Sequence, residues 1–386
     1  MKKTLIALAA LGAMAGAAQA QSTVTIYGLL DANIGSYKTN QISGAAISGI
    51  SQAKIDSGGL NGSRWGIRFS EDIGGGMAVI GNLESGINLD AGSSAQGGLL
   101  FGRRANVGIS SGFGTVTIGR NSSSYDDVSA DHAMMGATLF DPSNTNNGLS
   151  TATAATLGTL AGNASFLNHG GNGSGAHVTW VGFNTRFNNS IKYVSPNFGG
   201  FTGSFMYAFG EDKTAAVSAS NTVSANLKYA NGPLVVSGGY QSEGAARTAT
   251  TKPALVNTLL NVSYDFGVAK VGFGANRAKF KDVLTTFRTG VSHELAAQKE
   301  YSLSVAVPLG ATTLSAGYAR SKGDDLGSST GWGVQALYSL SKRTTLYTGA
   351  VSTKNYDNVA RNTLAIAPTS NITRTTTYAA GIRHTF

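Results

Sequence analysis

The amino-acid sequence predicts an all-β protein, a sixteen-stranded antiparallel β-barrel that crosses a membrane. Three observations support this fold class. Segments along most of the chain alternate between apolar side chains and small or polar ones, as strands between two different environments do. Short turns and long polar stretches alternate between these segments. Only 13% of the residues are charged, whereas soluble domains contain about 25%.

The N-terminus has the features of a secretory signal peptide. Two lysines follow Met1, residues 5–18 lack polar side chains, and an A-x-A motif ends at Ala20. This apolar run is shorter than the roughly 20 residues that a transmembrane helix needs. We therefore predict cleavage after Ala20, with a buried N-terminal helix as the alternative. The mature barrel domain, 21–386, would have 386 − 20 = 366 residues and a net charge of 9 − 2 = +7.

The composition of the mature chain suits a membrane barrel. The sequence contains 52 Gly, 14 Tyr, 16 Phe and no Cys, and its mean hydropathy is −0.01. No segment after the signal peptide reaches the 18 apolar residues of a membrane-spanning helix. A barrel with one face in lipid and the other in water needs this mixture of residues. Nucleic acid is not an expected partner, because Lys and Arg are scattered singly along strand-like segments of an exported chain.

Four segments show the alternation of a strand clearly. The first, 23–32, has one face of Val, Ile, Leu and Ala and another that carries Thr, Tyr and Asp. The same period of two recurs in 64–70, 222–229 and 301–307. In a soluble sandwich the apolar faces would meet in a core. Here the opposite faces are rich in Gly, Ser, Thr, Asn and charge, as expected for a water-filled lumen.

Connections of two lengths join these segments. Seven short turns contain the Gly, Pro, Asn, Asp and Ser that tight turns favour. They lie at 71–75, 110–114, 195–199, 230–233, 265–267, 308–310 and 341–343. Eight longer polar stretches lie at 36–59, 88–99, 121–180, 211–220, 242–254, 282–297, 321–330 and 355–373. Seven and eight connections join sixteen strands, although fourteen or eighteen remain alternatives because boundaries are uncertain by a few residues. The short turns are expected at the periplasmic end.

The last segment of the chain is predicted to close the barrel. Tyr378, Ala380 and Ile382 share one face with the terminal Phe386. Every strand edge must be paired in lipid, so this segment has to join the first one, 23–32. A terminal aromatic side chain on the lipid face would lie in the interfacial belt.

Seven motifs carry a resemblance to a known family. They are VTIYG at 24–28, GSRWG at 62–66, SEDIGGG at 70–76, FGR at 101–103, FGTVTIGR at 113–120, RFNNSIKYVSP at 186–196 and GIRHTF at 381–386. Together they make the chain resemble the Gram-negative general porins, particularly the beta-proteobacterial type. The resemblance implies a homotrimeric barrel in the bacterial outer membrane, a passive water-filled channel for small hydrophilic solutes and ions that uses no cofactor. It also implies a third external loop, at about 121–182, that folds inward and constricts the pore.

The resemblance further implies three arginines on the barrel wall that faces this loop. By position they are Arg64, Arg120 and Arg186. The alternation independently places Arg64 and Arg186 on polar faces. Arg120 shares the parity of apolar neighbours, so we expect a bulge at Gly119 to redirect it. The other basic residues on polar faces are Arg68, Arg104, Lys192 and Lys228.

The predicted constriction loop supplies the opposite charge. Its acids are Asp126, Asp127, Asp131 and Asp141, and His132 lies among them. We expect these acids to face the arginines across the pore and to create a transverse electric field. A low-complexity run at 146–176 makes the loop longer than the family pattern and leaves the pore width open. Because basic wall positions outnumber the wall acids Asp31 and Glu84, a mild anion preference is expected.

Other functions are less well supported by the sequence. The G-x-S-x-G motif at 327–331 links two strands, whereas a nucleophile elbow joins a strand to a helix. The five histidines show no metal-ligand spacing, and no Cys is present. One alternative is a channel specific for a sugar or phosphate. Another is an outer-membrane hydrolase on a barrel, in which Asp126-Asp127 and Asp131-His132 would activate water.

Overall fold

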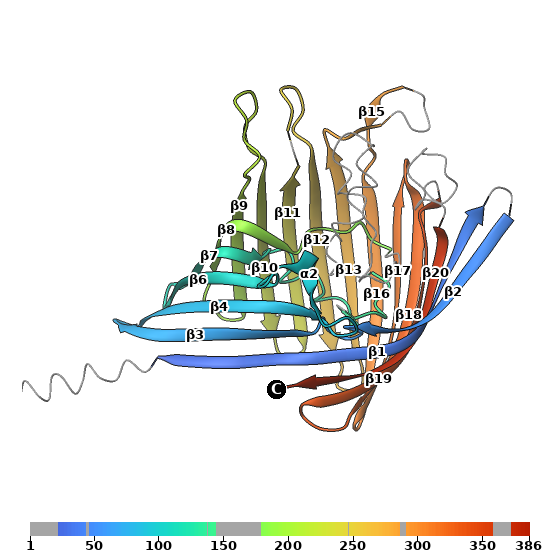
Figure 1. The fold of residues 1–386 in the computed structure, drawn as a ribbon, viewed down its shortest axis with the longest axis horizontal. Helices are drawn as coiled ribbons and strands as arrows, with labels where there is room; N and C mark the ends of the chain where they lie inside the picture. The colour runs from blue at the N-terminus through green and yellow to red at the C-terminus, as the bar shows by residue number, and fades with distance from the viewer. Residues whose placement is uncertain are drawn as a thin grey trace, which may run out of the picture.

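The computed structural model describes residues 22–43, 46–136, 138–143, 179–245, 247–285, 291–357 and 372–386. The predicted signal peptide, 1–20, and the low-complexity run, 146–176, lie outside these ranges. In the described part of the chain, eighteen strands belong to one sheet that closes on itself (Figure 1). No helix of that part is long and apolar enough to cross a membrane.

Sixteen of the described strands form the barrel wall, which confirms the predicted fold. They are β1 (Thr23–Ser43), β3 (Arg64–Gly74), β4 (Met77–Asn88), β6 (Arg104–Ser111), β7 (Gly114–Ser122), β8 (Arg186–Val194), β9 (Phe201–Phe209), β10 (Asn221–Asn231), β11 (Leu234–Gly244), β12 (Ala254–Asp265), β13 (Lys270–Lys281), β16 (Gln298–Leu309), β17 (Thr312–Gly323), β18 (Gly327–Ser339), β19 (Thr344–Lys354) and β20 (Ile372–Thr385). Neighbours in the wall pair antiparallel. The first half of β1 pairs with β3, and its second half pairs with β20, so the ring closes as predicted.

Five short or peripheral elements complete the described structure. They are β2 (Ala46–Ser57), β5 (Ser93–Ser94), α2 (Ala95–Gly98), β14 (Leu284–Thr285) and β15 (His293–Glu294). The strand β2 pairs with the second half of β1 and extends this corner beyond the wall (Figure 1). The stretch 36–59, predicted as a loop, is therefore mostly a hairpin. The predicted loop 321–330 is likewise almost all strand, because β17 and β18 continue to within three residues of each other. Beyond the bilayer neither face of a strand has to be apolar, so the alternation that predicts strands is lost there.

The two faces of the wall differ as the alternation predicts. On β1, the side chains of Val24, Ile26 and Ile34 are 68%, 69% and 64% exposed on the outside. Asp31, on the opposite face, is buried. An apolar outer surface suits contact with lipid hydrocarbon, and the polar groups face the interior.

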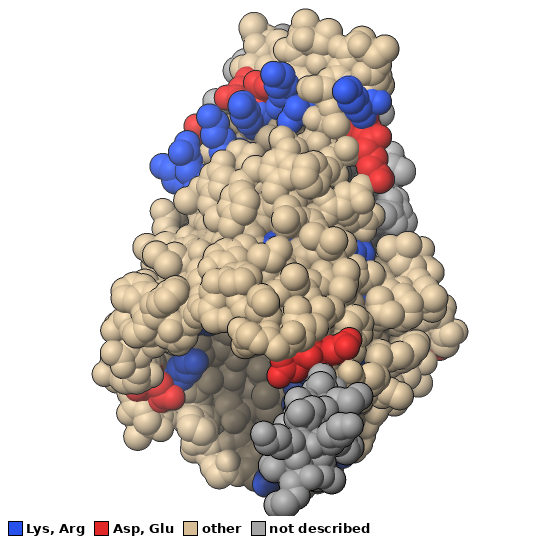
Figure 2. Space-filling model, turned by 90° about the vertical axis from the view of Figure 1, so that its left-hand side faces the viewer, with Lys and Arg blue, Asp and Glu red and all other residues tan. Residues whose placement is uncertain are grey.

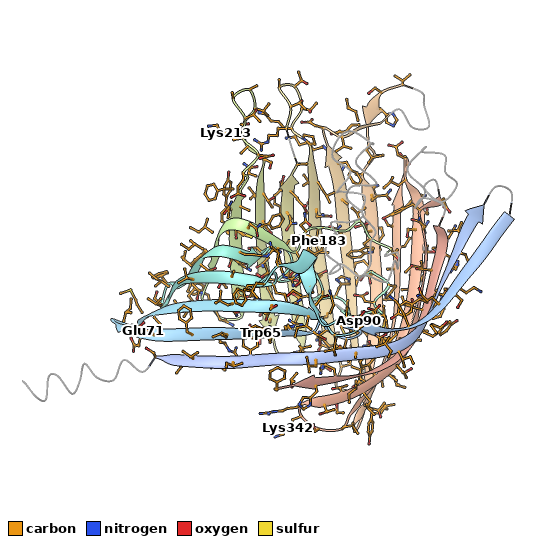
Figure 3. All side chains as sticks on the ribbon, in the orientation of Figure 1. Trp65, Glu71, Asp90, Phe183, Lys213 and Lys342 are labelled. Carbon is orange, nitrogen blue, oxygen red and sulfur yellow. The ribbon has the colours of Figure 1, made fainter. Side chains whose placement is uncertain are left out.

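Short turns gather at one end of the barrel and long connections at the other. Figure 3 labels Glu71 and Lys342 near short turns and Lys213 in a long connection at the opposite end. The turn between β3 and β4 contains three successive glycines, 74–76, with φ of 84°, 63° and 73°. Glycine adopts these angles without the steric cost that other residues carry. The sequence run thus serves as a tight turn.

Candidate functional site

The chain that follows β7 crosses the inside of the barrel, as the third long connection was predicted to do. The described parts of its outgoing segment, 123–136 and 138–143, run along the inner wall. The Tyr125 amide donates to Ser224 Oγ on β10 at 2.7 Å. Farther along, the Leu139 amide donates to the Gly59 carbonyl, just before β3, at 2.7 Å. The segment therefore spans the inner surface of the wall from β10 round to β3.

The returning segment, 179–185, is held by two buried carboxylates. The Val181 amide donates to Glu300 Oε1 on β16 at 2.6 Å. The Asn184 amide donates to Glu243 Oε2 on β11 at 3.0 Å. Buried carboxylates need such hydrogen bonds, since an unpaired charge away from water is costly. These two acids anchor the loop to the wall.

Glycines at inward positions of the wall make room for the loop. A Cβ atom added to Gly274 would lie 2.5 Å from His132 Cγ, and one added to Gly349 would lie 2.8 Å from Phe140 Cδ1. The other face of the His132 ring stacks on Trp180, with ring centroids 5.0 Å apart. His132 is therefore clamped between the wall and the returning segment, and it ties the two arms of the loop together.

Two of the predicted loop acids bind lysines on the wall. Asp127 Oδ2 lies 2.6 Å from Lys192 Nζ on β8. Asp131 Oδ1 lies 2.8 Å from Lys228 Nζ on β10. These acids thus lie beside wall lysines, a pairing that the sequence did not indicate. The pairing neutralises their charge locally. Asp141 instead accepts hydrogen bonds from the amide and hydroxyl of Ser143.

Asp126 and His132 are perturbed by burial in opposite senses. Burial raises the pKa of Asp126 to about 6, and the nearby Arg186 opposes this rise. Asp126 Oδ1 has no hydrogen-bond partner in the described part of the chain. Burial lowers the pKa of His132 to about 4. Each environment disfavours the charged form of its residue.

The basic cluster of the wall contains a residue that the sequence analysis did not select. Arg64 lies on β3 and Arg186 on β8, and the charge of Arg103 acts on both of them. Arg103 Nε lies 2.7 Å from Glu84 Oε1 on β4. Arg103 precedes β6 and belongs to no alternating segment, so parity could not assign it to a face. Its only signal in the sequence was the FGR motif.

Arg120 lies beside the expected irregularity in the wall. The register between β7 and β8 shifts between Gly119 and Asn121, and Gly119 has a φ of 123°. Arg120 Nε donates to the Gly102 carbonyl at 2.8 Å, and its Nη1 donates to Asn188 Oδ1 at 2.6 Å. The Arg120 guanidinium is thus held next to the backbone of residues 102–103. The side chain that pairs with Glu84 is that of Arg103.

Three of the predicted wall cations line a cavity in the lumen. This cavity has a volume of about 510 Å³. Its polar lining includes Arg68, Arg104, Asn82, Asn106, Asn121 and the paired Lys192 and Asp127. The Arg68 guanidinium carbon lies 4.7 Å from the centroid of the Tyr27 ring, and Tyr27 Oη donates to Glu84 Oε2 at 2.9 Å. The open side of the lumen therefore presents several cations and amides to water.

The described residues do not form the catalytic arrangements considered above. No group of three or more His, Cys, Asp and Glu among them is arranged to hold a metal ion. Ser329, in the G-x-S-x-G motif, lies within β18, and its Oγ donates to the Lys354 carbonyl at 2.7 Å. The pair Asp131-His132 is not available to activate water, because Asp131 binds Lys228 and His132 is buried in the ring stack.

Comparison with known proteins identifies the family. Residues 7–358 match the model of the Gram-negative porins. The chain belongs to the Gram-negative porin family. The porin is 33% identical over 367 residues to outer membrane porin protein 32 of Delftia acidovorans, with 92% of this chain and 91% of the relative covered. It is 31% identical over 298 residues to an outer membrane porin protein of Bordetella pertussis, with 72% of this chain and 69% of the relative covered.

Solved structures agree with this assignment. An anion-selective porin from Comamonas acidovorans shares 26% sequence identity with this porin and superposes with a TM-score of 0.71, covering 95% of this chain and 100% of that one. An OmpF structure from Salmonella typhi shares the fold alone, at 15% identity and a TM-score of 0.60, with 94% of this chain and 97% of that one covered. The protein is thus an outer-membrane porin, and its barrel is a channel.

Proposed function

We propose that this porin lets small hydrophilic solutes and ions diffuse passively and that it prefers anions. The observation that carries the proposal is the cluster of Arg64, Arg103 and Arg186, which has Glu84 as its paired acid. Two of the loop acids are already bound to wall lysines. The constriction therefore keeps an excess of positive charge that faces the solute.

This excess acts strongly because the passage is narrow. A channel lined by charge of one sign, with low-dielectric walls, focuses the field and enriches the counter-ion. The loop narrows the lumen on one side, and the arginines lie on the other. A small anion is attracted to the cluster, whereas a cation is repelled. The anion selectivity of the Comamonas porin supports the same preference here.

We also propose the arrangement of the porin in its membrane. The short turns would face the periplasm and the long connections the exterior, as in other barrels of this class. The resemblance implies a homotrimer. Residues 1–20 would be removed on export. A catalytic function is not supported, because Asp127 and Asp131 are paired with wall lysines and His132 is buried in a ring stack.

Planar-bilayer recordings on the purified mature protein test this function. A trimer of open pores should insert with three equal conductance steps. Across a tenfold gradient of KCl, the sign of the reversal potential should show that chloride is more permeant than potassium. A potassium preference would contradict the proposed selectivity, and the lack of any conductance would contradict the channel itself.

The lumen cavity favours one variation on this function. Arg68 and Arg104 line it together with several amides, whereas the third cation, Lys192, is paired with Asp127 in the same lining. A solute with two anionic groups could therefore bind to Arg68 and Arg104. A channel specific for such a solute would show a flux that saturates with concentration. A flux that rises linearly would support the general porin.

A further inference from the structure

Six basic side chains form a patch on the outside of the barrel near the long connections. They are Arg277, Lys279 and Lys281 on β13, Lys299 on β16, and Arg320 and Lys322 on β17, and all six are exposed. We call them the outer basic patch. Their parity on each strand is that of Phe273, Tyr301 and Tyr318, which are 45%, 49% and 50% exposed on the outer face. In Figure 2, Lys and Arg, with a few Asp and Glu beside them, gather along the upper part of the molecule, above a broad and almost uncharged band.

The strand register places like charges of this patch directly opposite each other. Arg277 is the partner of Lys299, and Lys299 is the partner of Lys322. Like charges at directly opposed positions destabilise a sheet unless something compensates them. The flanking strands offer no compensation at the same level, because the partner of Arg277 on β12 is Thr258 and that of Arg320 on β18 is Thr330.

The protein itself does not neutralise the patch within the described ranges. The ion pairs found there all involve other basic residues. Asp282 and Glu294 lie in the adjoining connection, where Asp282 Oδ2 accepts from the Lys252 amide and Glu294 Oε1 from the Asp282 amide. Asp324 lies two residues beyond Lys322. Even with these three acids, the six cations leave an excess of positive charge on this surface.

The level of the patch in the membrane follows from the aromatic residues beneath it. Tyr301 lies one outward-facing position closer to the barrel centre than Lys299, and Tyr318 has the same relation to Arg320. Aromatic side chains of barrels mark the boundary between hydrocarbon and headgroups. One such step is two residues, or about 7 Å. The patch therefore lies at the level of the lipid headgroups, and three adjacent strands make it about 10 Å wide.

We propose that the outer basic patch binds the phosphate groups of a phosphorylated lipid in the outer leaflet. A lipid fits better than a free anion, because its acyl chains would lie on the apolar band directly below while its phosphates bind the cations. Headgroup phosphates attract Lys and Arg at a membrane surface by this kind of electrostatic contact. The inference depends on the proposed orientation, in which the long connections face the exterior.

The test measures lipid binding by the folded mature porin in a neutral detergent. Lipid A, which carries two phosphates, is titrated, and native mass spectrometry counts the lipids bound to each barrel. The R277Q/K299Q/K322Q variant removes the row of opposed charges and is expected to bind about tenfold more weakly or worse. Because the variant relieves repulsion it should fold, and its heat-modifiable mobility on a gel checks this. The matched control, K342Q/R343Q, removes a Lys and an Arg from a short turn at the opposite end and should bind as the unmodified porin does.

Three results would overturn the proposal. The first is that the R277Q/K299Q/K322Q variant (the row variant) binds lipid A as tightly as the unmodified porin does. The second is that lipid A without its phosphates binds equally well. The third is that inorganic phosphate at the same concentration displaces the lipid. The last result would assign the patch to free anions. Chloride conductance of the row variant, recorded in parallel, should be unchanged, since the patch lies outside the lumen. A failure of the channel proposal would thus be visible independently of lipid binding.

Discussion

The inner surface of this porin has two unlike walls. The open wall, from β3 to β8, presents Arg64, Arg103 and Arg186 to the lumen. The covered wall, from β10 to β19, is lined by the two arms of the third loop. On the open wall Arg64, Arg103 and Arg186 outnumber their paired acid Glu84, and only Lys192, at the edge of this wall, pairs with a loop acid among the described residues. On the covered wall the charged groups serve as anchors for the loop. The comparison shows that the same alternating strands yield either a solute-facing surface or a binding surface for the chain itself.

The difference between the walls arises from what faces each inward position. Inward glycines on the covered wall, such as Gly274 and Gly349, accommodate ring side chains of the loop. Inward positions on the open wall include long charged side chains such as Arg68 and Arg104, together with the amides of Asn82, Asn106 and Asn121. Selectivity is therefore expected to depend on the open wall, and the width and stability of the pore on the covered wall. The predictions below separate these two roles.

The largest expected effect is loss of a loop anchor on the covered wall. Glu300 accepts hydrogen bonds from the Val181 amide at 2.6 Å, Asn276 Nδ2 at 2.7 Å and Ser321 Oγ at 3.0 Å. Glu300→Ala leaves the Val181 amide and one N–H of Asn276 without an acceptor, at about 1–3 kcal/mol each, whereas Ser321 Oγ can still donate to Gln298 Oε1. Urea unfolding should show a loss of about 3 kcal/mol or more, and single-channel currents should become noisier. Glu300→Gln, which keeps an acceptor oxygen, should lose much less; equal stability of the two variants would argue against the anchor.

The next prediction concerns the pH dependence of the loop. His132, with its pKa lowered to about 4, favours folding when neutral, so its contribution is lost as pH falls from about 6.5 toward 4. A shift of this size corresponds to about 3 kcal/mol. Asp126, with its pKa raised to about 6, penalises folding at neutral pH, and this penalty is relieved as pH falls from 6 toward 4. The two effects should nearly cancel in the unmodified porin.

Single substitutions should uncover each effect. In Asp126→Asn only the titration of His132 remains, so the free energy of unfolding should fall as the pH is lowered from 6.5 to 4. In His132→Phe only the titration of Asp126 remains, so the free energy of unfolding should rise as the pH is lowered over the same range. Denaturant titrations at several pH values measure both slopes, and two variants with parallel pH profiles would refute the assignment.

A smaller effect is expected from closing the space beneath the loop. Gly274→Ala places a methyl group against the His132 ring and should cost about 1–3 kcal/mol through overpacking. Gly238→Ala is the matched control, because its Cβ would lie 3.6 Å from the nearest neighbour, the Leu259 carbonyl oxygen. Thermal unfolding of both variants checks the pair. If both lose the same stability, the loss reflects glycine in strands generally rather than a seat for the loop.

The wall of the barrel was largely predictable from the sequence, because a strand between lipid and water must alternate. The faces of β1 follow directly from Val24 and Ile26 against Asp31. The prediction failed where that constraint ends. The hairpin of β1 and β2 extends past the bilayer, so its residues are under no pressure to alternate, and the stretch 36–59 was taken for a loop.

The pore-lining residues were only partly predictable. Arg64 lies on an alternating strand, so parity indicated its face, whereas Arg103 lies just outside β6 and has no parity. The partners of the loop acids could not be predicted at all. Asp131 and Lys228 are 97 residues apart, and only the path of the loop across the barrel brings them together. Contacts of this kind depend on tertiary structure rather than on local pattern.

The most direct test of the account compares selectivity after each wall is neutralised. The R64Q/R103Q/R186Q variant removes the cations of the open wall, and the K228Q/D131N variant removes a neutral pair from the covered wall. Reversal potentials across a KCl gradient should show that the first variant loses about tenfold of its chloride-to-potassium permeability ratio, while the second keeps nearly all of it. An unchanged ratio in the first variant, or an equal loss in both, would contradict the claim that the open wall selects the ion.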